Sequence, residues 1–132
     1  MHRTKPLILI AERDPFMRYA LARALEEHFE LEFVADGAQA LERIHAHPPA
    51  LVILEALLPT LDGFQVCQQI KKDPDTRHIP VIFFTLLLTE ERALHAGADG
   101  FLLKPLHRER LLETINRLLT NVSVEQQAQR EE

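Results

Sequence analysis

Several charged and polar side chains follow short apolar segments of this sequence, where their types could bind ions. They are Glu12, Arg13 and Asp14 after the first segment, Glu55 after the third, Thr85 at the end of the fourth, and Lys104 with Pro105 after the fifth. Carboxylates bind cations, whereas a hydroxyl and an ammonium group bind the oxygens of an anion. The alternative is that these residues only cap helices and form surface ion pairs, which also gather at loop rims.

The five apolar segments have the composition of β-strands. They are Leu7–Ala11, Leu31–Ala35, Leu51–Leu54, Pro80–Thr85 and Gly100–Leu103. Four are continuously apolar, which is typical of strands covered on both faces in a parallel sheet, whereas the second alternates and is expected at an edge. Residues with helical spacing follow each segment, so the sequence predicts an α/β fold, (βα)5, with a doubly wound five-stranded parallel sheet. The polar residues would then meet at the carboxyl edge of this sheet.

Local signals also predict where several helices begin and end. Asp14 before Pro15 is expected to be an N-cap, because proline suits the first helical position. Asp62 is expected to cap the third helix, and Thr89 to begin the fourth. Gly97 is expected to end that fourth helix.

Composition limits the classes of protein to which the chain could belong. Its 132 residues fit one domain, which we expect at residues 1–120, with a polar C-terminal tail or linker at residues 121–132. The formal net charge of −5 argues against binding nucleic acid. The sequence has no apolar run of membrane-spanning length, and its one cysteine, Cys67, is expected in the core, so we expect a cytoplasmic protein.

The motifs together resemble the receiver domain of bacterial two-component response regulators over about residues 5–120. The matching segments are Leu7–Pro15, Pro49–Glu55, Leu58–Phe64, Ile79–Thr85 and Ala96–Pro105. The resemblance implies a flavodoxin-like strand order, 2-1-3-4-5. It also implies an acidic pair that binds Mg²⁺ after the first strand, and an aspartate after the third strand that accepts a phosphoryl group.

The resemblance further implies a switch at the ends of the fourth and fifth strands. Thr85 and Lys104 match the residues that grip the phosphoryl oxygens in the family. Phe101 matches a mobile aromatic residue three positions before the lysine. The bond between Lys104 and Pro105 is expected to be cis.

Departures from the family pattern indicate a degenerate receiver, or pseudo-receiver. Glu55 stands at the phosphoacceptor position, and Arg13 replaces the second acid of the pair, while Glu12 keeps its charge. Magnesium prefers oxygen ligands, whereas a guanidinium offers only donors, so Mg²⁺ binding is predicted to be lost and no cofactor is expected. We expect Arg13 to occupy the place of the ion and to pair with Glu55 or Glu12. The alternative is that Arg13 extends into solvent.

Without the metal ion the family's phosphoryl transfer loses its main source of charge neutralisation. Glutamate is also one methylene longer than aspartate, which displaces its carboxylate. Thr85 and Lys104 could then bind the Glu55 carboxylate, unless Arg13 takes it. We therefore predict a phosphorylation-independent signalling domain that binds partner proteins and is not an enzyme.

The segment after the fourth strand is the candidate partner surface. From Thr85 to Gly97 it is about one helical turn shorter than the family pattern, so the fourth helix is expected to be short. Leu86, Leu87 and Leu88, with Phe101, could form an exposed partner face. The alternative, which we favour for at least two of the three leucines, is a longer strand that buries them.

In the family, the face of helix 4, strand 5 and helix 5 binds partners and forms dimers. The expected partners are signalling proteins such as a histidine kinase or an output protein, or a second copy of the chain, and not nucleic acid or a membrane. One alternative is a phosphorylatable receiver with an atypical pocket, as the N-terminal part of a longer regulator. Another is a flavodoxin-like cofactor binder, which the lack of glycine in the first loop disfavours. A metal site at His45 and His47 is also disfavoured, because no third ligand completes it.

Overall fold

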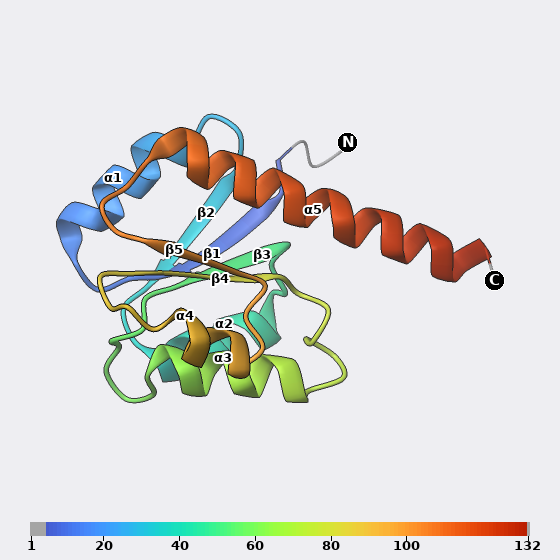
Figure 1. Ribbon diagram of the computed structural model, residues 1–132, viewed down its shortest axis with the longest axis horizontal. Helices are drawn as coiled ribbons and strands as arrows, with labels where there is room; N and C mark the ends of the chain where they lie inside the picture. Colours follow the sequence, from blue (N-terminus) through green and yellow to red (C-terminus); the bar gives the residue numbers. More distant parts are fainter. Residues whose placement is uncertain (1–4, 132) are drawn as a thin grey trace.

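The computed structural model describes residues 5–131, with side chains described for residues 5–121. Five strands and five helices alternate along the chain (Figure 1). The strands are β1 (Leu7–Ala11), β2 (Glu30–Val34), β3 (Leu51–Leu54), β4 (Val81–Thr85) and β5 (Gly100–Leu103). The helices are α1 (Pro15–Leu25), α2 (Gly37–Ala46), α3 (Gly63–Lys72), α4 (Glu90–His95) and α5 (Arg108–Glu131).

The strands form one parallel sheet in the order β2-β1-β3-β4-β5. This confirms the predicted flavodoxin-like order and the edge position of the second strand. The ladder places Ala11 beside Leu54 and Thr85 beside Leu103. The carboxyl ends of β1, β3, β4 and β5 therefore lie along one edge, where the predicted polar residues follow.

Helices cover both faces of the sheet, as the continuously apolar strands predicted (Figure 1). One core cluster lies between the sheet and helices α2, α3 and α4, and includes Val66 and Ile70. The other lies between the sheet and helices α1 and α5, and includes Leu21 and Ile115. Successive strand residues point into opposite clusters, so strands with four or five apolar residues in a row supply both cores.

The helix ends follow the local signals closely. The Asp14 side chain accepts a hydrogen bond from the Phe16 N–H, and Pro15 lies in the first turn of α1. Asp62 and Gln65 form a reciprocal capping box at α3. Thr89 precedes α4 but makes no side-chain cap bond there. Gly97, with φ of 102°, ends that helix in the left-handed conformation that glycine adopts without strain.

The fourth and fifth helices differ greatly in length. Helix α4 has only six residues, which confirms the prediction of a short helix. Helix α5 has 24 residues and crosses position 120, where the boundary between domain and tail stays a prediction. Within the described residues, no helix is both long and apolar enough to cross a bilayer.

Candidate functional site

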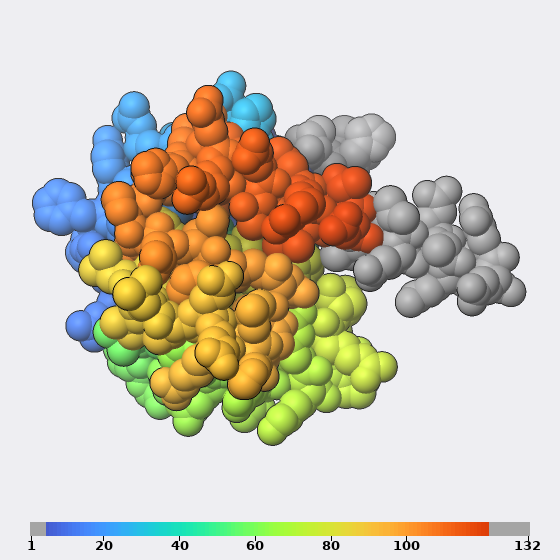
Figure 2. Space-filling view, viewed as in Figure 1, coloured from blue at the N-terminus to red at the C-terminus, as the bar shows by residue number. Residues whose placement is uncertain are grey.

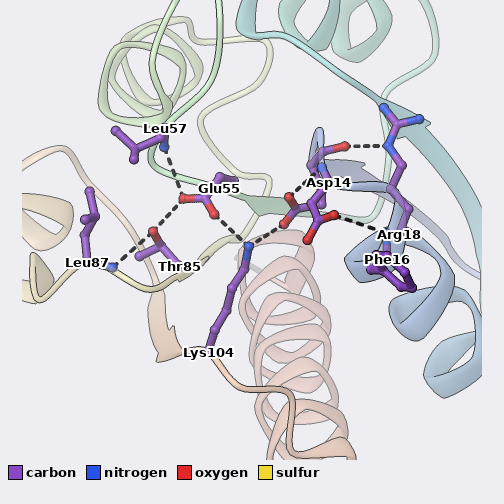
Figure 3. Close-up of polar contacts among 9 residues, drawn as sticks. Asp14, Phe16, Arg18, Glu55, Leu57, Thr85, Leu87 and Lys104 are labelled. Carbon is purple, nitrogen blue, oxygen red and sulfur yellow. Dashed lines mark hydrogen bonds and ion pairs between the residues drawn. The ribbon is translucent and has the colours of Figure 1, made fainter.

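A cluster of charged side chains lies where the strands end, at the carboxyl edge of the sheet (Figure 3). Glu12 follows β1 and Glu55 follows β3, while Thr85 ends β4 and Lys104 follows β5. The Lys104 Nζ donates a hydrogen bond to the Glu12 Oε1 and another to the Glu55 Oε1, both at 2.8 Å. The exposed fractions of the three side chains are only 9% for Lys104, 3% for Glu12 and 11% for Glu55. The lysine thus bridges two buried carboxylates.

The second oxygen of Glu55 joins two loops at this edge. Glu55 Oε2 accepts a hydrogen bond from the Thr85 hydroxyl at 2.5 Å and another from the Leu57 N–H at 3.1 Å. The Thr85 oxygen in turn accepts a bond from the Leu87 N–H at 3.4 Å. One carboxylate therefore engages both Thr85 and Lys104, and holds the loop after β3 close to the loop after β4 (Figure 3).

Glu12 is held in a similar way by its own segment. Its Oε2 accepts a hydrogen bond from the Asp14 N–H at 3.1 Å. Its backbone carbonyl accepts a bond from the Arg18 Nε, and the Arg18 guanidinium lies 6.0 Å from the centre of the Phe33 ring. Among the described residues, every buried side-chain nitrogen and oxygen has a hydrogen-bond partner. The buried polar groups of the site are therefore already hydrogen-bonded within the protein.

The charges of this network stabilise one another. Burial by itself raises the pKa of Glu55, but the hydrogen bonds from Lys104, Thr85 and Leu57 outweigh it and hold that pKa below its ordinary value. Burial by itself lowers the pKa of Lys104, but the bonds to Glu12 and Glu55 hold it above its ordinary value. Lys104 is therefore an ammonium ion and Glu55 a carboxylate at neutral pH.

The expectation that Arg13 pairs with Glu12 or Glu55 is wrong. Arg13 is exposed, and in the described part of the chain no hydrogen bond or ion pair joins its side chain to another residue. The Glu12 N–H still donates to the Val34 carbonyl, so the chain remains extended here and neighbouring side chains point in opposite directions. Since Glu12 faces inward, Arg13 faces solvent, and Lys104 lies between the two carboxylates.

The loop between β4 and α4 also departs from the favoured expectation of buried leucines. Strand β4 ends at Thr85, and Leu86 and Leu88 are 73% and 87% exposed. Only Leu87 packs against the core, in the cluster on the side of helix α3. Phe101 is half-buried against the same cluster. Two of the three leucines thus form an exposed apolar surface beside the site.

The other residues singled out in the sequence lie outside the charged network. Pro105 is exposed, and the peptide bond that precedes it is cis, as expected. Cys67 is a free, fully buried thiol, and burial raises its pKa to about 12. Asp62 caps helix α3 and takes no part in the charged network. His45 contacts Asp73 rather than His47.

Two contributors to the site were missed in the sequence. The Phe84 ring lies beneath Lys104, with the ammonium nitrogen 5.6 Å from the ring centre. The Leu57 N–H bonds to Glu55, as described above. Phe84 gave only the signal of a buried strand residue, and a backbone N–H gives no side-chain signal at all.

The buried side chains at this site offer few oxygen ligands for a magnesium ion. Mg²⁺ needs oxygen ligands in a near-octahedral arrangement. Glu12 and Glu55 supply two carboxylates, but the Lys104 ammonium already bridges them. The described residues contain no group of three or more acidic, histidine or cysteine side chains that could hold a metal.

Comparison with known proteins identifies relatives of this chain. The sequence model of the response regulator receiver domain matches residues 8–116. Response regulator PleD of Caulobacter vibrioides is 33% identical over 103 residues, which cover 76% of this chain and 23% of PleD. Response regulator MprA of Mycobacterium ulcerans is 35% identical over 120 residues, which cover 89% of this chain and 52% of MprA. The chain thus spans about half or less of the length of these relatives.

A solved structure shows the same arrangement of elements. The receiver domain of sensor histidine kinase PA1611 from Pseudomonas aeruginosa superposes with a TM-score of 0.82 and 26% sequence identity. The match covers 88% of this chain and 98% of that one, and the PA1611 structure has a magnesium ion coordinated in its active-site cleft.

Proposed function

Because this chain belongs to the response regulator receiver domain family, we propose that it is a signalling domain that binds partner proteins without being phosphorylated. The observation that carries this proposal is the bridge from Lys104 to both Glu12 and Glu55. The domain acts by a fixed shape and has no catalytic activity of its own. We place it in the cytoplasm, where two-component signalling proteins meet their partners.

The residues that grip a phosphoryl group in the family are already engaged here. Thr85 and Lys104, which match those residues, both donate hydrogen bonds to Glu55. Phosphorylation of Glu55 would convert the carboxylate that both side chains bind into an uncharged acyl group, so the bonds from Thr85 and Lys104 would both have to be replaced. Phosphoryl transfer also needs the charge neutralisation that a metal ion supplies, and these side chains offer few oxygen ligands for magnesium. Both arguments support the proposal that the site is not phosphorylated.

The Glu55 carboxylate fills the place of a phosphoryl group only in part. It carries one negative charge, whereas a phosphoryl group carries nearly two and has three acceptor oxygens. Lys104 also divides its hydrogen bonds between Glu55 and Glu12. We propose that the bond between Glu55 and Thr85 keeps the loop after β4 in one conformation, so that the domain does not switch between two states.

The proposed partner surface adjoins this loop. Leu86 and Leu88 are exposed on the loop, Leu94 is 53% exposed on α4, and Leu103 is 41% exposed on β5. Figure 2 shows residues 86–103, in yellow and orange, beside the described part of α5 on one face of the molecule. Exposed apolar groups that lie together on a small domain indicate a binding surface. A signalling protein such as a histidine kinase or an output protein is the proposed occupant, and a second copy of the chain is the alternative.

A phosphorylation assay tests this proposal directly. The wild type and the variants Glu55→Asp, Arg13→Asp and Glu55→Asp/Arg13→Asp are incubated with acetyl phosphate and magnesium, and their intact masses are measured. We expect the wild type and both single variants to gain no phosphoryl group, and the double variant to gain one. A phosphorylated wild type would overturn the proposal.

The second candidate is a receiver that is phosphorylated on an atypical pocket within a longer regulator. The lengths of PleD and MprA favour this candidate, because both relatives continue beyond the region that matches this chain. Beryllofluoride, which mimics a phosphoryl group, distinguishes the two. It should shift the NMR signals of Thr85 and Lys104 in the second candidate and leave them unchanged in the proposed one.

A further inference from the structure

The imidazole ring of His45 lies between the last turn of α2 and the segment that follows α3. Its Nδ1 is 2.9 Å from the Leu41 carbonyl oxygen, one turn earlier on the same helix. Its Nε2 is 2.9 Å from the Asp73 Oδ2, at the C-terminal end of α3. The ring is therefore the polar link between the ends of two helices that lie side by side on one face of the sheet (Figure 1).

Both atoms that the ring contacts are hydrogen-bond acceptors. A backbone carbonyl oxygen never donates, and an ionised carboxylate oxygen does not donate either. Asp73 is ionised at neutral pH, because its bonds from His45 and from the Asp75 N–H hold its pKa below the ordinary value. A neutral imidazole has only one N–H, whereas an imidazolium has two. The two contacts are therefore both hydrogen bonds only when the ring is protonated.

From this geometry we propose that His45 is a protonation-dependent clasp between α2 and α3. The clasp is closed when the ring is an imidazolium that donates to both Leu41 and Asp73. When the ring loses a proton, one of the two nitrogens faces an acceptor with no hydrogen to share. The link between the helix ends then opens. This inference does not depend on whether Glu55 accepts a phosphoryl group.

The surrounding charges favour the closed state. The hydrogen bond to Asp73, the bond to the Leu41 carbonyl, and the charges of Asp73 and Asp75 together raise the pKa of His45 against the opposing effect of burial. Among the nearby cations, Arg43 and Lys71 contact other groups. Arg43 pairs with Glu32, Lys71 pairs with Asp99 and bonds to the Arg77 and Ile79 carbonyls, and Lys72 is exposed. The His45 imidazolium also lies in the last turn of α2, where the negative end of the helix dipole favours a positive charge.

The pH window follows from the signs of these shifts. A raised pKa in the folded state means that the contribution of His45 is complete below its ordinary pKa of about 6.5 and is lost as the pH rises through the folded value. A lowered pKa at Asp73 means that its contribution is lost only as the pH falls through that value, well into acid. The clasp is therefore closed below about pH 6.5 and opens as the pH rises through the raised pKa of His45.

The opening is confined to one end of α2, because the other end is held independently. The Thr60 Oγ1 accepts a hydrogen bond from the Ala38 N–H at 2.9 Å, and the Asp36 side chain caps the helix at the Gln39 N–H. Thr60 belongs to the loop after β3, and its bond to the Ala38 N–H does not involve His45. Loss of the clasp frees the C-terminal turn of α2 and leaves the N-terminal end attached to the loop that carries Leu57.

NMR titration of the histidine rings tests the clasp in the full chain. The midpoint for His45 is measured in the wild type, in Asp73→Asn and in the control His47→Gln, since His47 is exposed and lies two residues away. We expect a midpoint above that of a model histidine peptide in the wild type, a lower one in Asp73→Asn, and no change in His47→Gln. A wild-type midpoint equal to that of the peptide, or one that Asp73→Asn leaves unchanged, overturns the proposal.

Hydrogen exchange provides a second measurement that does not need a destabilised variant. In the wild type we expect the amides of the last turn of α2 to lose protection as the pH rises through the His45 midpoint, after correction for the intrinsic effect of pH on exchange. The amides of the first turn should keep theirs. Uniform protection along α2 across this range would mean that the ring does not hold the helix end, and would equally overturn the clasp.

Discussion

At the scale of single residues, Lys104 determines how the charges of the site are arranged. Lys104 lies between two buried carboxylates and offers each of them a hydrogen bond of 2.8 Å. A buried charge without a partner is costly, so the three side chains depend on one another. The arrangement stabilises the domain and, under the proposed function, occupies the lysine that would otherwise bind a phosphoryl group.

Replacing Lys104 by methionine should therefore destabilise the domain strongly. The substitution leaves Glu12 and Glu55 buried beside each other without their shared cation. We expect the free energy of unfolding to fall by about 3–5 kcal/mol, as for other broken buried ion pairs, in urea denaturation at neutral pH. The control Lys72→Met alters an exposed lysine and should change this free energy by less than about 0.5 kcal/mol. Equal effects of the two substitutions would contradict a buried bridge.

The same network predicts how stability depends on acid. The lowered pKa of Glu55 means that its contribution is complete above the ordinary glutamate pKa of about 4.3 and is lost as the pH falls through the folded value. The raised pKa of Lys104 means that its contribution is lost only in strongly alkaline solution. The difference in free energy of unfolding between wild type and Glu55→Gln should stay constant around neutral pH and shrink in acid. A difference that did not change with pH would show that Glu55 is not ionised in the bridge.

At the scale of elements, short backbone approaches position the end of β3. The N–H of Gly63, in the first turn of α3, donates to the Ala56 carbonyl at 2.9 Å. A Cβ atom at Gly63 would lie only 2.4 Å from the Glu55 carbonyl oxygen. The capping box of Asp62 and Gln65 fixes this same turn. The start of α3 thus sets where the backbone of Glu55 lies.

We therefore expect Gly63→Ala to disturb both stability and the site. The added methyl group must push the backbone of Glu55 away from α3, and overpacking of this kind costs about 1–3 kcal/mol. Urea denaturation would measure the loss, and NMR shifts of Glu55 and Thr85 would report the displacement. Gly100→Ala is the matched control, since a Cβ there meets only side chains at 3.4 Å or more. If both substitutions cost the same and neither moved the site, the close approach at Gly63 would not be a constraint.

At the scale of the whole molecule, two core clusters on opposite faces of the sheet make the domain a single folding unit. The strands contribute residues to both clusters, so the packing of each layer of helices depends on the same sheet. Cys67 lies in the cluster on the side of α3 and is fully buried. Its thiol therefore reports on the integrity of that cluster.

Labelling of Cys67 should require opening of the core. Burial raises its pKa to about 12 and removes the thiolate that reacts. With a disulfide reagent at pH 8, we expect native protein to react slower than protein in urea by a factor on the order of 10³ or more, because opening is rare. The rate should rise with urea in parallel with unfolding. Fast labelling in native buffer would show that the cluster opens locally.

Sequence alone determined the elements and the residue types at the carboxyl edge. Continuous apolar runs fixed the strands of a parallel sheet, and Asp14 and Asp62 marked helix starts, because capping depends on residues only two or three positions apart. The presence of Glu12, Glu55, Thr85 and Lys104 at strand ends likewise followed from the alternation of strands and helices.

Only the tertiary structure decided which of these charges meet. Arg13 and Lys104 were both able to reach Glu55 by length and charge, and their destinations depend on the direction of the backbone at each site. Extended backbone turns Arg13 outward beside the inward Glu12, whereas Lys104 leaves the end of β5 toward the neighbouring strand ends. The same holds for Leu86 and Leu88, whose exposure depends on where β4 stops. Contacts between distant segments follow from packing in three dimensions, which local spacing does not encode.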